Sequence, residues 1–123
     1  LERYAPQVQL ELADPPRETR IAEAHLHTVL ANLVENALRH GAGKAVQVRL
    51  GQDQGRLSIA VRDQGPGISA ANQTRLFQRF FTTERDRGGT GLGLSIVKAI
   101  AEARGGHVSA TSSPEGSTFY VVL

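Results

Sequence analysis

The sequence predicts an α+β fold, a two-layer α/β sandwich in which three main helices pack on a mixed, largely antiparallel five-stranded sheet. Apolar residues recur at helical spacings of three and four over residues 24–40, and again over residues 92–104. Shorter segments alternate apolar and polar residues, as half-buried strands do. The chain of 123 residues is long enough for a core of its own, so we expect residues 1–123 to form a single domain.

Composition and charge exclude several classes of protein. Apolar residues make up 40% of the chain and charged residues 21%, which is typical of a folded domain. Because there is no Cys, disulfides and thiolate metal sites are excluded. The 14 Lys and Arg residues are spread along the chain with few aromatic residues between them, so we expect no nucleic-acid binding. No apolar run approaches the roughly 20 residues that span a bilayer. The chain starts without Met, and we expect it to be one domain of a longer protein.

The first half of the chain is expected to contain strands, a long helix and a hairpin. Residues 8–12 predict a strand, and a second short strand is expected at residues 19–22. The helix over residues 24–40 has basic residues in its last turn and a glycine just beyond it, both favourable at a helix end. Residues 45–50 and 56–63 predict a hairpin. We expect the helices to pack on the apolar face of this hairpin, formed by Val46, Val48, Leu50, Leu57, Ile59 and Val61.

The second half predicts two helices and another hairpin. A short, serine-capped helix is expected over residues 69–79. Residues 81–91 follow no period and predict a mobile loop. The apolar helix over residues 92–104 ends at two glycines. Residues 107–111 and 118–122 then predict the remaining strands.

Two asparagines interrupt the long helix. Asn32 and Asn36 are four residues apart and therefore share one face. Asn is a poor helix former, and the pair costs about 1 kcal/mol relative to Ala. Either both amides are solvated or bond to a neighbouring loop, or both face a ligand and offer an amide oxygen to a hard cation.

An acidic turn follows the second strand of the first hairpin. Asp63 is followed by Gly65 and Gly67, with a proline between the two glycines. The turn is either an ordinary Asx-type turn at the surface, or a site where Asp63 accepts a hydrogen bond from the exocyclic amine of a purine. In the second case the two glycines let the base approach the backbone.

Glycines alternate with larger residues over residues 88–94, just where the last apolar helix begins. A glycine-rich segment that opens a helix leaves free N–H groups and the positive end of the helix dipole pointing at one place. Such a segment is typical of a phosphate site, although many glycine loops are only turns.

Four segments stand in one order along the chain: residues 32–37, 63–67, 77–81 and 89–94. Together they closely resemble the N, G1, F and G2 boxes of the catalytic and ATP-binding (HATPase) domain of bacterial sensor histidine kinases, in the superfamily of gyrase, histidine kinase and mismatch-repair ATPases. The resemblance covers the chain from about residue 20 to its end. It implies a Bergerat-type ATP-binding fold with an ATP lid at about 81–91, and ATP and Mg²⁺ as cofactors.

The resemblance assigns roles to individual residues. Asn36 is the expected Mg²⁺ ligand, with Asn32 one turn earlier on the same face. Asp63 is expected to bind adenine, and Thr118 to lie behind the base. The full set expected at the nucleotide is Asn32, Asn36, Arg39, His40, Asp63, Gly65, Gly67, Ile68, Phe80, Thr90, Gly91, Leu92, Gly93, Leu94 and Thr118.

The candidate catalytic residues are Asn32, Glu35, Arg85 and Arg87. The related ATPases carry Glu at the position of Asn32, where it activates water. Asn is a poor base, which suits a kinase that passes phosphate to another protein. Glu35 either helps to orient the acceptor or has a surface role. Where relatives often carry Lys, this chain has Glu84, so Arg85 or Arg87 either neutralises the transferring phosphate or is a solvated loop charge.

The resemblance implies the kinase domain of a two-component sensor, which transfers the γ-phosphate of Mg·ATP to a histidine on a separate dimerisation domain and so signals to a response regulator. None of the chain's histidines at positions 25, 27, 40 and 107 has the sequence context of an acceptor. The phosphoacceptor, dimerisation and sensor domains are therefore expected outside this chain. We expect the isolated chain to be monomeric and the parent homodimeric, with this domain in the cytoplasm and the parent at the inner membrane.

Other functions stay open at this point. One is a non-catalytic, nucleotide-responsive regulatory module, and another is a serine kinase of the anti-sigma type. A true ATPase is a further alternative, against which Asn32 argues.

Overall fold

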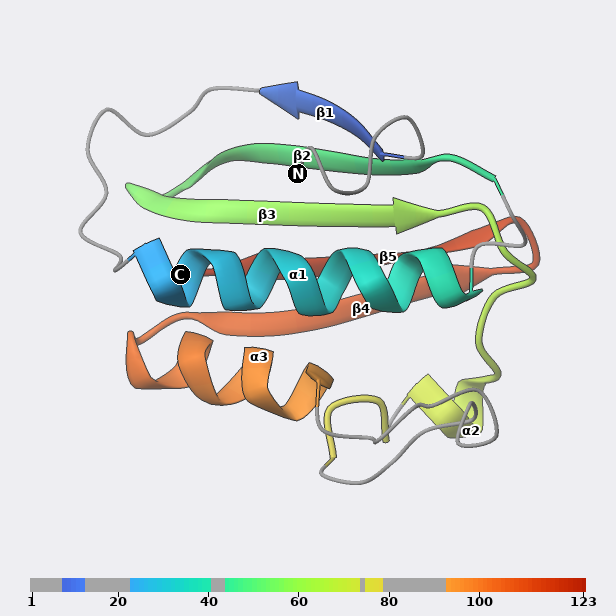
Figure 1. Ribbon diagram of the computed structural model, residues 1–123. Helices are drawn as coiled ribbons and strands as arrows, with labels where there is room; N and C mark the ends of the chain where they lie inside the picture. Colours follow the sequence, from blue (N-terminus) through green and yellow to red (C-terminus); the bar gives the residue numbers. More distant parts are fainter. Residues whose placement is uncertain (1–7, 13–22, 41–43, 74, 79–92) are drawn as a thin grey trace.

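The α+β class predicted from the sequence is confirmed by the computed structural model, which describes residues 8–12, 23–40, 44–73, 75–78 and 93–123 (Figure 1). The elements in chain order are β1 (Val8–Leu12), α1 (Glu23–His40), β2 (Val46–Asp53), β3 (Arg56–Asp63), α2 (Ala70–Gln73), α3 (Gly93–Ala103), β4 (His107–Ser113) and β5 (Gly116–Val122). The short strand expected at 19–22 and the loop expected at 81–91 lie outside the described residues.

The strands form one five-stranded sheet in the order β1-β2-β3-β5-β4. β1 pairs in parallel with β2, and the β2–β3, β3–β5 and β4–β5 pairs are antiparallel. The sheet is therefore mixed and largely antiparallel, as expected. β5, the last strand in the sequence, lies in the interior of the sheet between β3 and β4.

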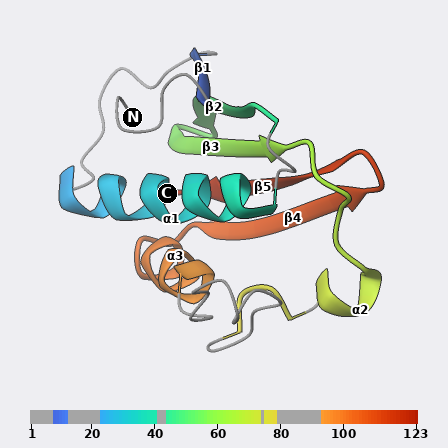
Figure 2. The ribbon, with the colours of Figure 1, turned by 45° about the vertical axis from the view of Figure 1, so that its right-hand side comes forward.

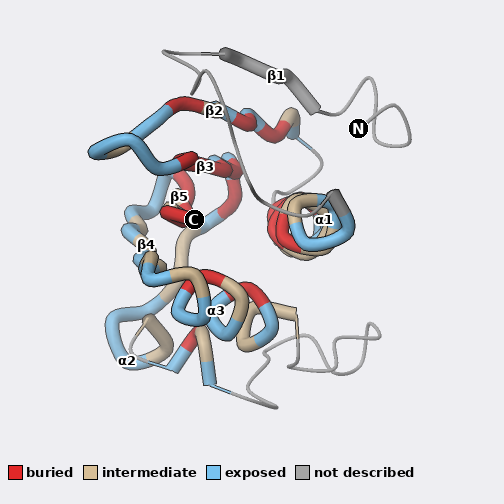
Figure 3. Tube along the Cα trace, turned by 90° about the vertical axis from the view of Figure 1, so that its left-hand side faces the viewer, coloured by how far each residue is buried: buried red, intermediate tan, exposed pale blue. Residues whose placement is uncertain are grey.

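Helices α1 and α3 cover one face of the sheet and contact each other (Figures 1 and 3). The expected alternation of the first hairpin is observed, because Val46 and Val48 are fully buried while Gln47 and Arg49 between and beside them are exposed. The largest fully buried side chains of the core are Phe119, Leu33, Ile59, Val29, Val34, Val46, Val48, Val61, Val97 and Val121. Figure 3 shows the buried side of α1 turned toward the sheet.

The helix expected over residues 69–79 is shorter in the structure. Its helical part is only Ala70–Gln73, and the chain continues in turns closed by i→i+3 bonds such as Gln78 N–H to the Arg75 carbonyl, at 3.0 Å. Ser69 caps the helix as predicted, because its Oγ accepts a hydrogen bond from the Asn72 N–H at 3.2 Å.

Helix α3 ends at the glycine pair that the sequence marks. Gly105 has a φ of +82°, and the Gly106 N–H donates to the Ala101 carbonyl at 2.8 Å. The Gly105 N–H donates to the Glu102 carbonyl at 3.0 Å. These bonds form a Schellman cap, which needs a left-handed residue at the position that Gly105 occupies.

Several elements converge at one end of the sheet. The end of α1, the end of β3, helix α2, the start of α3 and the turn between β4 and β5 all lie there (Figures 1 and 2). None of the helices within the described ranges combines the length and the apolar character that a bilayer crossing requires.

Candidate functional site

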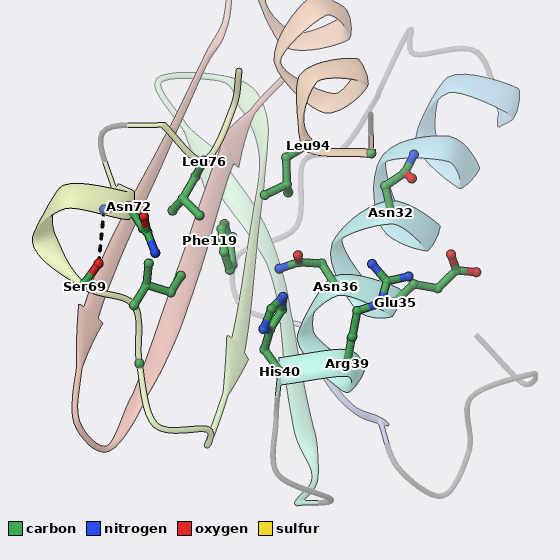
Figure 4. Close-up of a pocket in the computed structure, with 13 residues that line it drawn as sticks. Asn32, Glu35, Asn36, Arg39, His40, Ser69, Asn72, Leu76, Leu94 and Phe119 are labelled. Atoms are coloured by element: carbon green, nitrogen blue, oxygen red, sulfur yellow. Dashed lines mark hydrogen bonds between the residues drawn. The ribbon is translucent and has the colours of Figure 1, made fainter. Parts of the chain in front are cut away.

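A cavity of about 200 Å³ lies at this end of the molecule, between α1, the segment after β3, and the start of α3 (Figure 4). Its lining residues are Asn32, Glu35, Asn36, Arg39, His40, Gly67, Ile68, Ser69, Asn72, Leu76, Gly93, Leu94 and Phe119. One wall is polar and comes from α1. The opposite side carries the apolar Leu76 and the polar Ser69 and Asn72, with Phe119 of β5 between the two sides (Figure 4).

The polar wall follows from the spacing of α1. Asn32, Asn36 and His40 are each four residues apart, so they lie one above another on one face of the helix. The neighbouring Leu33 and Ala37 are fully buried and fix this rotation of the helix. Burial of the apolar stripe in the core therefore turns the amides toward the cavity.

The two asparagines differ in how their amides are satisfied. Asn32 Nδ2 donates to the Thr28 carbonyl at 2.9 Å, so the Asn32 Oδ1 atom is the one that faces away from the helix. Asn36 Nδ2 is buried and has no hydrogen-bond partner among the residues that the structure describes. A buried, unpaired amide costs about 1–3 kcal/mol. Asn36 is therefore held in a position that the ligand-free domain does not satisfy.

The start of α3 lies directly against Asn32. A Cβ atom on Gly93 would come within 2.9 Å of Asn32 Oδ1, closer than real Cβ contacts allow. The glycine at the first position of the helix thus lets α1 and the N-terminus of α3 approach each other. The N–H groups of the first turn of a helix have no partner within the helix and favour anions.

Asp63 lies at the end of β3 and anchors the following segment. Its side chain is 2% exposed, and its Oδ1 accepts hydrogen bonds from the Gly65 N–H at 3.0 Å and the Ser117 N–H at 3.2 Å. Within the described residues, Oδ2 accepts no hydrogen bond. One carboxylate oxygen of Asp63 therefore positions the following segment, and the other remains available as a hydrogen-bond acceptor.

The glycines after Asp63 are required by close packing. A Cβ on Gly65 would overlap the backbone carbonyl of His40 at the end of α1. A Cβ on Gly67, which has a φ of +87°, would overlap the Ser113 carbonyl and come within 2.9 Å of Ser112 Oγ. The segment therefore fits between α1 and the β4–β5 turn only because these two side chains are absent.

The structure gathers many of the residues that the sequence marks. Those that line the cavity are Asn32, Glu35, Asn36, Arg39, His40, Gly67, Ile68, Gly93 and Leu94. Glu35 and Arg39 are exposed, on the solvent side of α1 (Figure 4). Asp63 and Gly65 do not line the cavity but hold the segment that does. The expected residues Phe80, Arg85, Arg87, Thr90, Gly91 and Leu92 lie outside the described residues.

Thr118 is the expected site residue that the structure places elsewhere. It pairs with Arg62 and Thr111, both exposed, on the face of the sheet opposite Phe119. Its neighbour Ser117 is 3% exposed and lies on the cavity side, where its N–H bonds to Asp63. A shift of one residue along a strand moves a side chain to the other face. Ser117, and not Thr118, therefore lies on the face of the sheet that carries Phe119.

Some lining residues were not marked as site residues. Leu76 and Phe119 lie in segments that the sequence predicts only as a helix and a strand, and Phe119 also packs edge-on against Phe77, with ring centroids 6.3 Å apart. Ser69 was expected only as a helix cap. Asn72 carries no signal in the sequence, because it reaches the cavity through the position of α2 and not through a motif.

The family of the chain is shown by a family model described as "Histidine kinase-, DNA gyrase B-, and HSP90-like ATPase", which matches residues 21–123. The alginate biosynthesis sensor protein KinB of Pseudomonas aeruginosa is 37% identical over 118 residues, covering 94% of this chain and 20% of KinB. The sensor histidine kinase YcbM of Bacillus subtilis is 36% identical over 121 residues, covering 94% of this chain and 39% of YcbM. The chain therefore spans well under half the length of these relatives.

Solved structures agree with this match. The mycobacterial sensor histidine kinase MprB superimposes with a TM-score of 0.81 at 30% identity, covering 99% of this chain and 86% of that chain. A full-length ShkA in complex with AMPPNP has a TM-score of 0.80 at 28% identity, covering 98% of this chain and 27% of that chain. The described fold, the four ordered motifs and the family match agree, and the chain belongs to the family of histidine kinase-, DNA gyrase B- and HSP90-like ATPases.

Proposed function

We propose that residues 1–123 form the ATP-binding kinase domain of a two-component sensor histidine kinase. The observation that carries the proposal is the unpaired, buried amide of Asn36, which faces the same cavity as the glycine-opened start of α3. A polar group that the ligand-free domain leaves unsatisfied is typical of a binding site. Members of this family bind ATP, and the related ShkA was solved with AMPPNP, an ATP analogue.

The adenine end of the site is assigned to the segment that Asp63 anchors. The free Oδ2 of Asp63 accepts a hydrogen bond from the exocyclic amine of adenine, while Gly67 and Ile68 form the wall beside the base. A hydrogen bond to a charged acceptor contributes about 1.5–3 kcal/mol. This interaction selects adenine over guanine, because guanine carries an oxygen at that position of the ring.

The phosphate end is assigned to Asn36 and the N-terminus of α3. The Asn36 amide is free to turn its oxygen into the cavity, where it fits a hard cation such as Mg²⁺. No group of 3 or more His, Cys, Asp or Glu side chains in the described residues is placed to hold a metal. A single amide oxygen from Asn36 suits Mg²⁺ that is held mainly by the nucleotide phosphates and water. The bound Mg²⁺ supplies charge neutralisation on the transferring phosphate.

Asn32 favours transfer to a protein over hydrolysis. Its amide is not a base, and its Nδ2 is committed to the Thr28 carbonyl. Water in the cavity is therefore not activated by this residue. The γ-phosphate passes to a histidine on a separate dimerisation domain and then to a response regulator, in a homodimeric parent at the inner membrane. Glu35, Arg85 and Arg87 remain the candidates for orienting the acceptor and neutralising charge, with the lid at about 81–91.

Nucleotide binding tests the site directly. Calorimetry with ADP and GDP, with and without Mg²⁺, should show adenine-selective binding. Asp63→Asn should weaken ADP binding by about tenfold to a hundredfold, since Asn keeps the Oδ1 acceptor but replaces Oδ2 with a donor. Asn36→Ala should remove the dependence on Mg²⁺. Equal binding of both bases, or none, would refute the proposal.

A second measurement separates kinase from the other functions. The domain is supplied with the phosphoacceptor domain of its parent and radiolabelled Mg·ATP. Acid-labile label on histidine supports the proposal, whereas acid-stable label on serine indicates a serine kinase. Binding without transfer indicates a regulatory module, and steady phosphate release by the domain alone indicates an ATPase.

A further inference from the structure

The wall of the cavity after β3 has no regular secondary structure, so its position depends on a few hydrogen bonds. Residues 64–69 lie between the end of β3 and the start of α2. Asp63 fixes the first part of this segment through the Gly65 N–H. The second part, which contributes Gly67 and Ile68 to the cavity, is held by other side-chain hydrogen bonds.

Two side chains bond to Ile68 in this part. Gln73 Nε2 donates to the Ile68 carbonyl at 3.0 Å and ties it to α2. The hydroxyl of Ser112, near the end of β4, ties it to the sheet. The Ile68 N–H donates to Ser112 Oγ at 2.6 Å, across 44 residues of sequence. The same oxygen lies 2.9 Å from the place where a Cβ on Gly67 would be. The hydroxyl therefore bonds to Ile68 and lies beside Gly67, where only the absence of a side chain leaves room for it.

Ser112 is itself connected to Asp63. Its Oγ lies 2.9 Å from Ser117 Oγ, and the Ser117 N–H donates to Asp63 Oδ1 at 3.2 Å. Ser112 and Ser117 are direct partners across β4 and β5. Ile68 in the wall and the carboxylate of Asp63 are therefore both hydrogen-bonded to the β4–β5 strand pair.

We propose that Ser112 is a positioning residue that sets base selectivity, by holding the Gly67–Ile68 wall at a fixed distance from Asp63. This inference rests on the proposed function. Ser112 lies outside all four motifs, and it does not line the cavity. Without its hydroxyl the Ile68 N–H loses its acceptor, the wall moves away from the base, and adenine is no longer held against Asp63.

The neighbouring Ser113 provides a matched control. Its hydroxyl accepts a hydrogen bond from the Glu115 N–H at 3.2 Å within the exposed β4–β5 turn. Ser113→Ala therefore removes the same chemical group one residue away, without touching the wall.

The test measures ADP and GDP affinity in the full 123-residue chain by competition against a fluorescent ADP analogue. Ser112→Ala should weaken ADP binding by about fivefold to tenfold and leave GDP binding within about twofold, so the ratio of the two affinities falls. Ser113→Ala should leave both affinities and their ratio unchanged. The gain in ADP affinity on adding Mg²⁺ should be the same in all variants, because Asn36 lies at the other end of the cavity.

Two further measurements separate positioning from a general loss of structure. Ser112→Thr keeps the hydroxyl and should restore most of the selectivity. Amide hydrogen exchange in the ligand-free chain should show Ile68 protected in the unmodified chain and in Ser113→Ala, slightly less protected in Ser112→Thr, and much less protected in Ser112→Ala. If Ser112→Ala does not fold, Ser112→Cys takes its place, because a thiol has a similar shape but is a weak hydrogen-bond acceptor. The proposal then predicts faster Ile68 exchange and a smaller ADP-to-GDP affinity ratio in Ser112→Cys than in Ser112→Thr, and equal values in the two variants overturn it.

The outcomes are distinct. An unmodified chain that binds neither nucleotide refutes the proposed function and this inference with it. An unmodified chain that selects ADP, with Ser112→Ala keeping the same ADP-to-GDP ratio, refutes only the role of Ser112. Equal weakening of ADP and GDP, or fast Ile68 exchange in the unmodified chain, also overturns it.

Discussion

Gly65 lies so close to the last carbonyl of α1 that a methyl group there has no room. A Cβ would overlap the His40 backbone and sit 3.4 Å from Asp63 Oδ1. We expect Gly65→Ala to lower the free energy of unfolding by more than about 2 kcal/mol, because backbone and not a flexible side chain must move. Gly55→Ala is the control, since its Cβ meets nothing within 4 Å and only its φ of +80° is strained, at about 1–2 kcal/mol. Urea unfolding of the two variants measures the difference, and an equal loss of unfolding free energy in both would contradict the expectation.

Asn36 gives a prediction about the ligand-free domain. Its buried Nδ2 has no hydrogen-bond partner in the described part of the chain, so replacing the amide with an apolar group of similar shape removes the cost of an unsatisfied polar group. We expect Asn36→Leu to raise the free energy of unfolding by about 1 kcal/mol while abolishing Mg²⁺-dependent ADP binding. Asn32→Leu should not stabilise the domain, because the Asn32 amide already bonds to the Thr28 carbonyl. Denaturant titration of both variants makes the comparison, and a destabilised Asn36→Leu would show that the amide is satisfied by water.

Tyr120 is expected to make the free energy of unfolding depend on pH in the alkaline range. Burial, followed by the hydrogen bond from its hydroxyl to Asp53 Oδ2 at 3.1 Å, raises the pKa of Tyr120 above its ordinary value of about 10. The folded chain therefore holds the phenol proton more tightly than the unfolded chain. Its contribution is complete below pH about 10 and is lost as the pH rises through the higher folded pKa. When the pH is raised from about 8 to about 11, the free energy of unfolding measured in urea should fall less for Tyr120→Phe than for the unmodified chain. Equal decreases in the two chains would rule out this contribution.

At the scale of single residues, the sequence predicts a site residue well when its neighbours fix its direction. Asn32 and Asn36 are predictable because the apolar stripe of α1 decides which way they face. Ser117 and Thr118 are not, because both carry a hydroxyl and the residues after them are apolar on both faces of the strand. Only the pairing of β5 with its neighbours decides between the two.

Among the elements, α3 depends on a residue from the first hairpin. Arg56, at the start of β3, donates from Nη1 to the Arg104 carbonyl at 2.7 Å and to Leu123 O at 3.4 Å. We expect Arg56→Ala to lower the free energy of unfolding by about 1 kcal/mol, because the end of α3 loses a cationic donor. Arg62→Ala should be close to neutral, because the Arg62 side chain is exposed on the outer face of the sheet. Melting of the two variants side by side measures this, and equal effects would argue against capping by Arg56.

The elements that the sequence predicts best are those with a long, regular period. Helix α1, strand β3 and helix α3 fall within one residue of their expected bounds, because each buries one continuous apolar face. Strand β2 continues to Asp53, three residues beyond its expected end. The bounds of α2 do not match, since none of its four residues, two Ala, one Asn and one Gln, is buried. Such a segment is held by its cap and by contacts made elsewhere, which a local pattern does not encode.

For the whole molecule, nucleotide should act as a stabiliser. A ligand that binds only the folded state adds about 2.7 kcal/mol at a hundred times its dissociation constant. We expect Mg·ADP at that excess to raise the melting temperature of the unmodified chain clearly, because the cavity walls come from segments far apart in sequence. At the same concentration of Mg·ADP, the melting temperature of Asp63→Asn should rise less. A melting temperature that does not respond to Mg·ADP would count against the site.

The class of fold and the mixed character of the sheet were predictable from the sequence. The convergence of distant segments at one end of the sheet was not. Periodicity describes each segment alone and says nothing about which end of the sheet α2 and the start of α3 reach. The resemblance to ordered motifs supplied that step. The Ser112 contact with Ile68 joins residues 44 positions apart that belong to no common pattern, so only the structure reveals it.

The strand order also governs when the domain can form during synthesis. β5 is made last, yet it lies between β3 and β4 and brings Phe119 and Val121 to the core. Until residues 116–122 have left the ribosome, β3 has an open edge and the core lacks its largest side chain. At synthesis rates of about 5–20 residues per second, the nascent chain spends seconds with this edge exposed. The complete core can therefore form only after β5 has been made, and the edge of β3 stays unpaired until then.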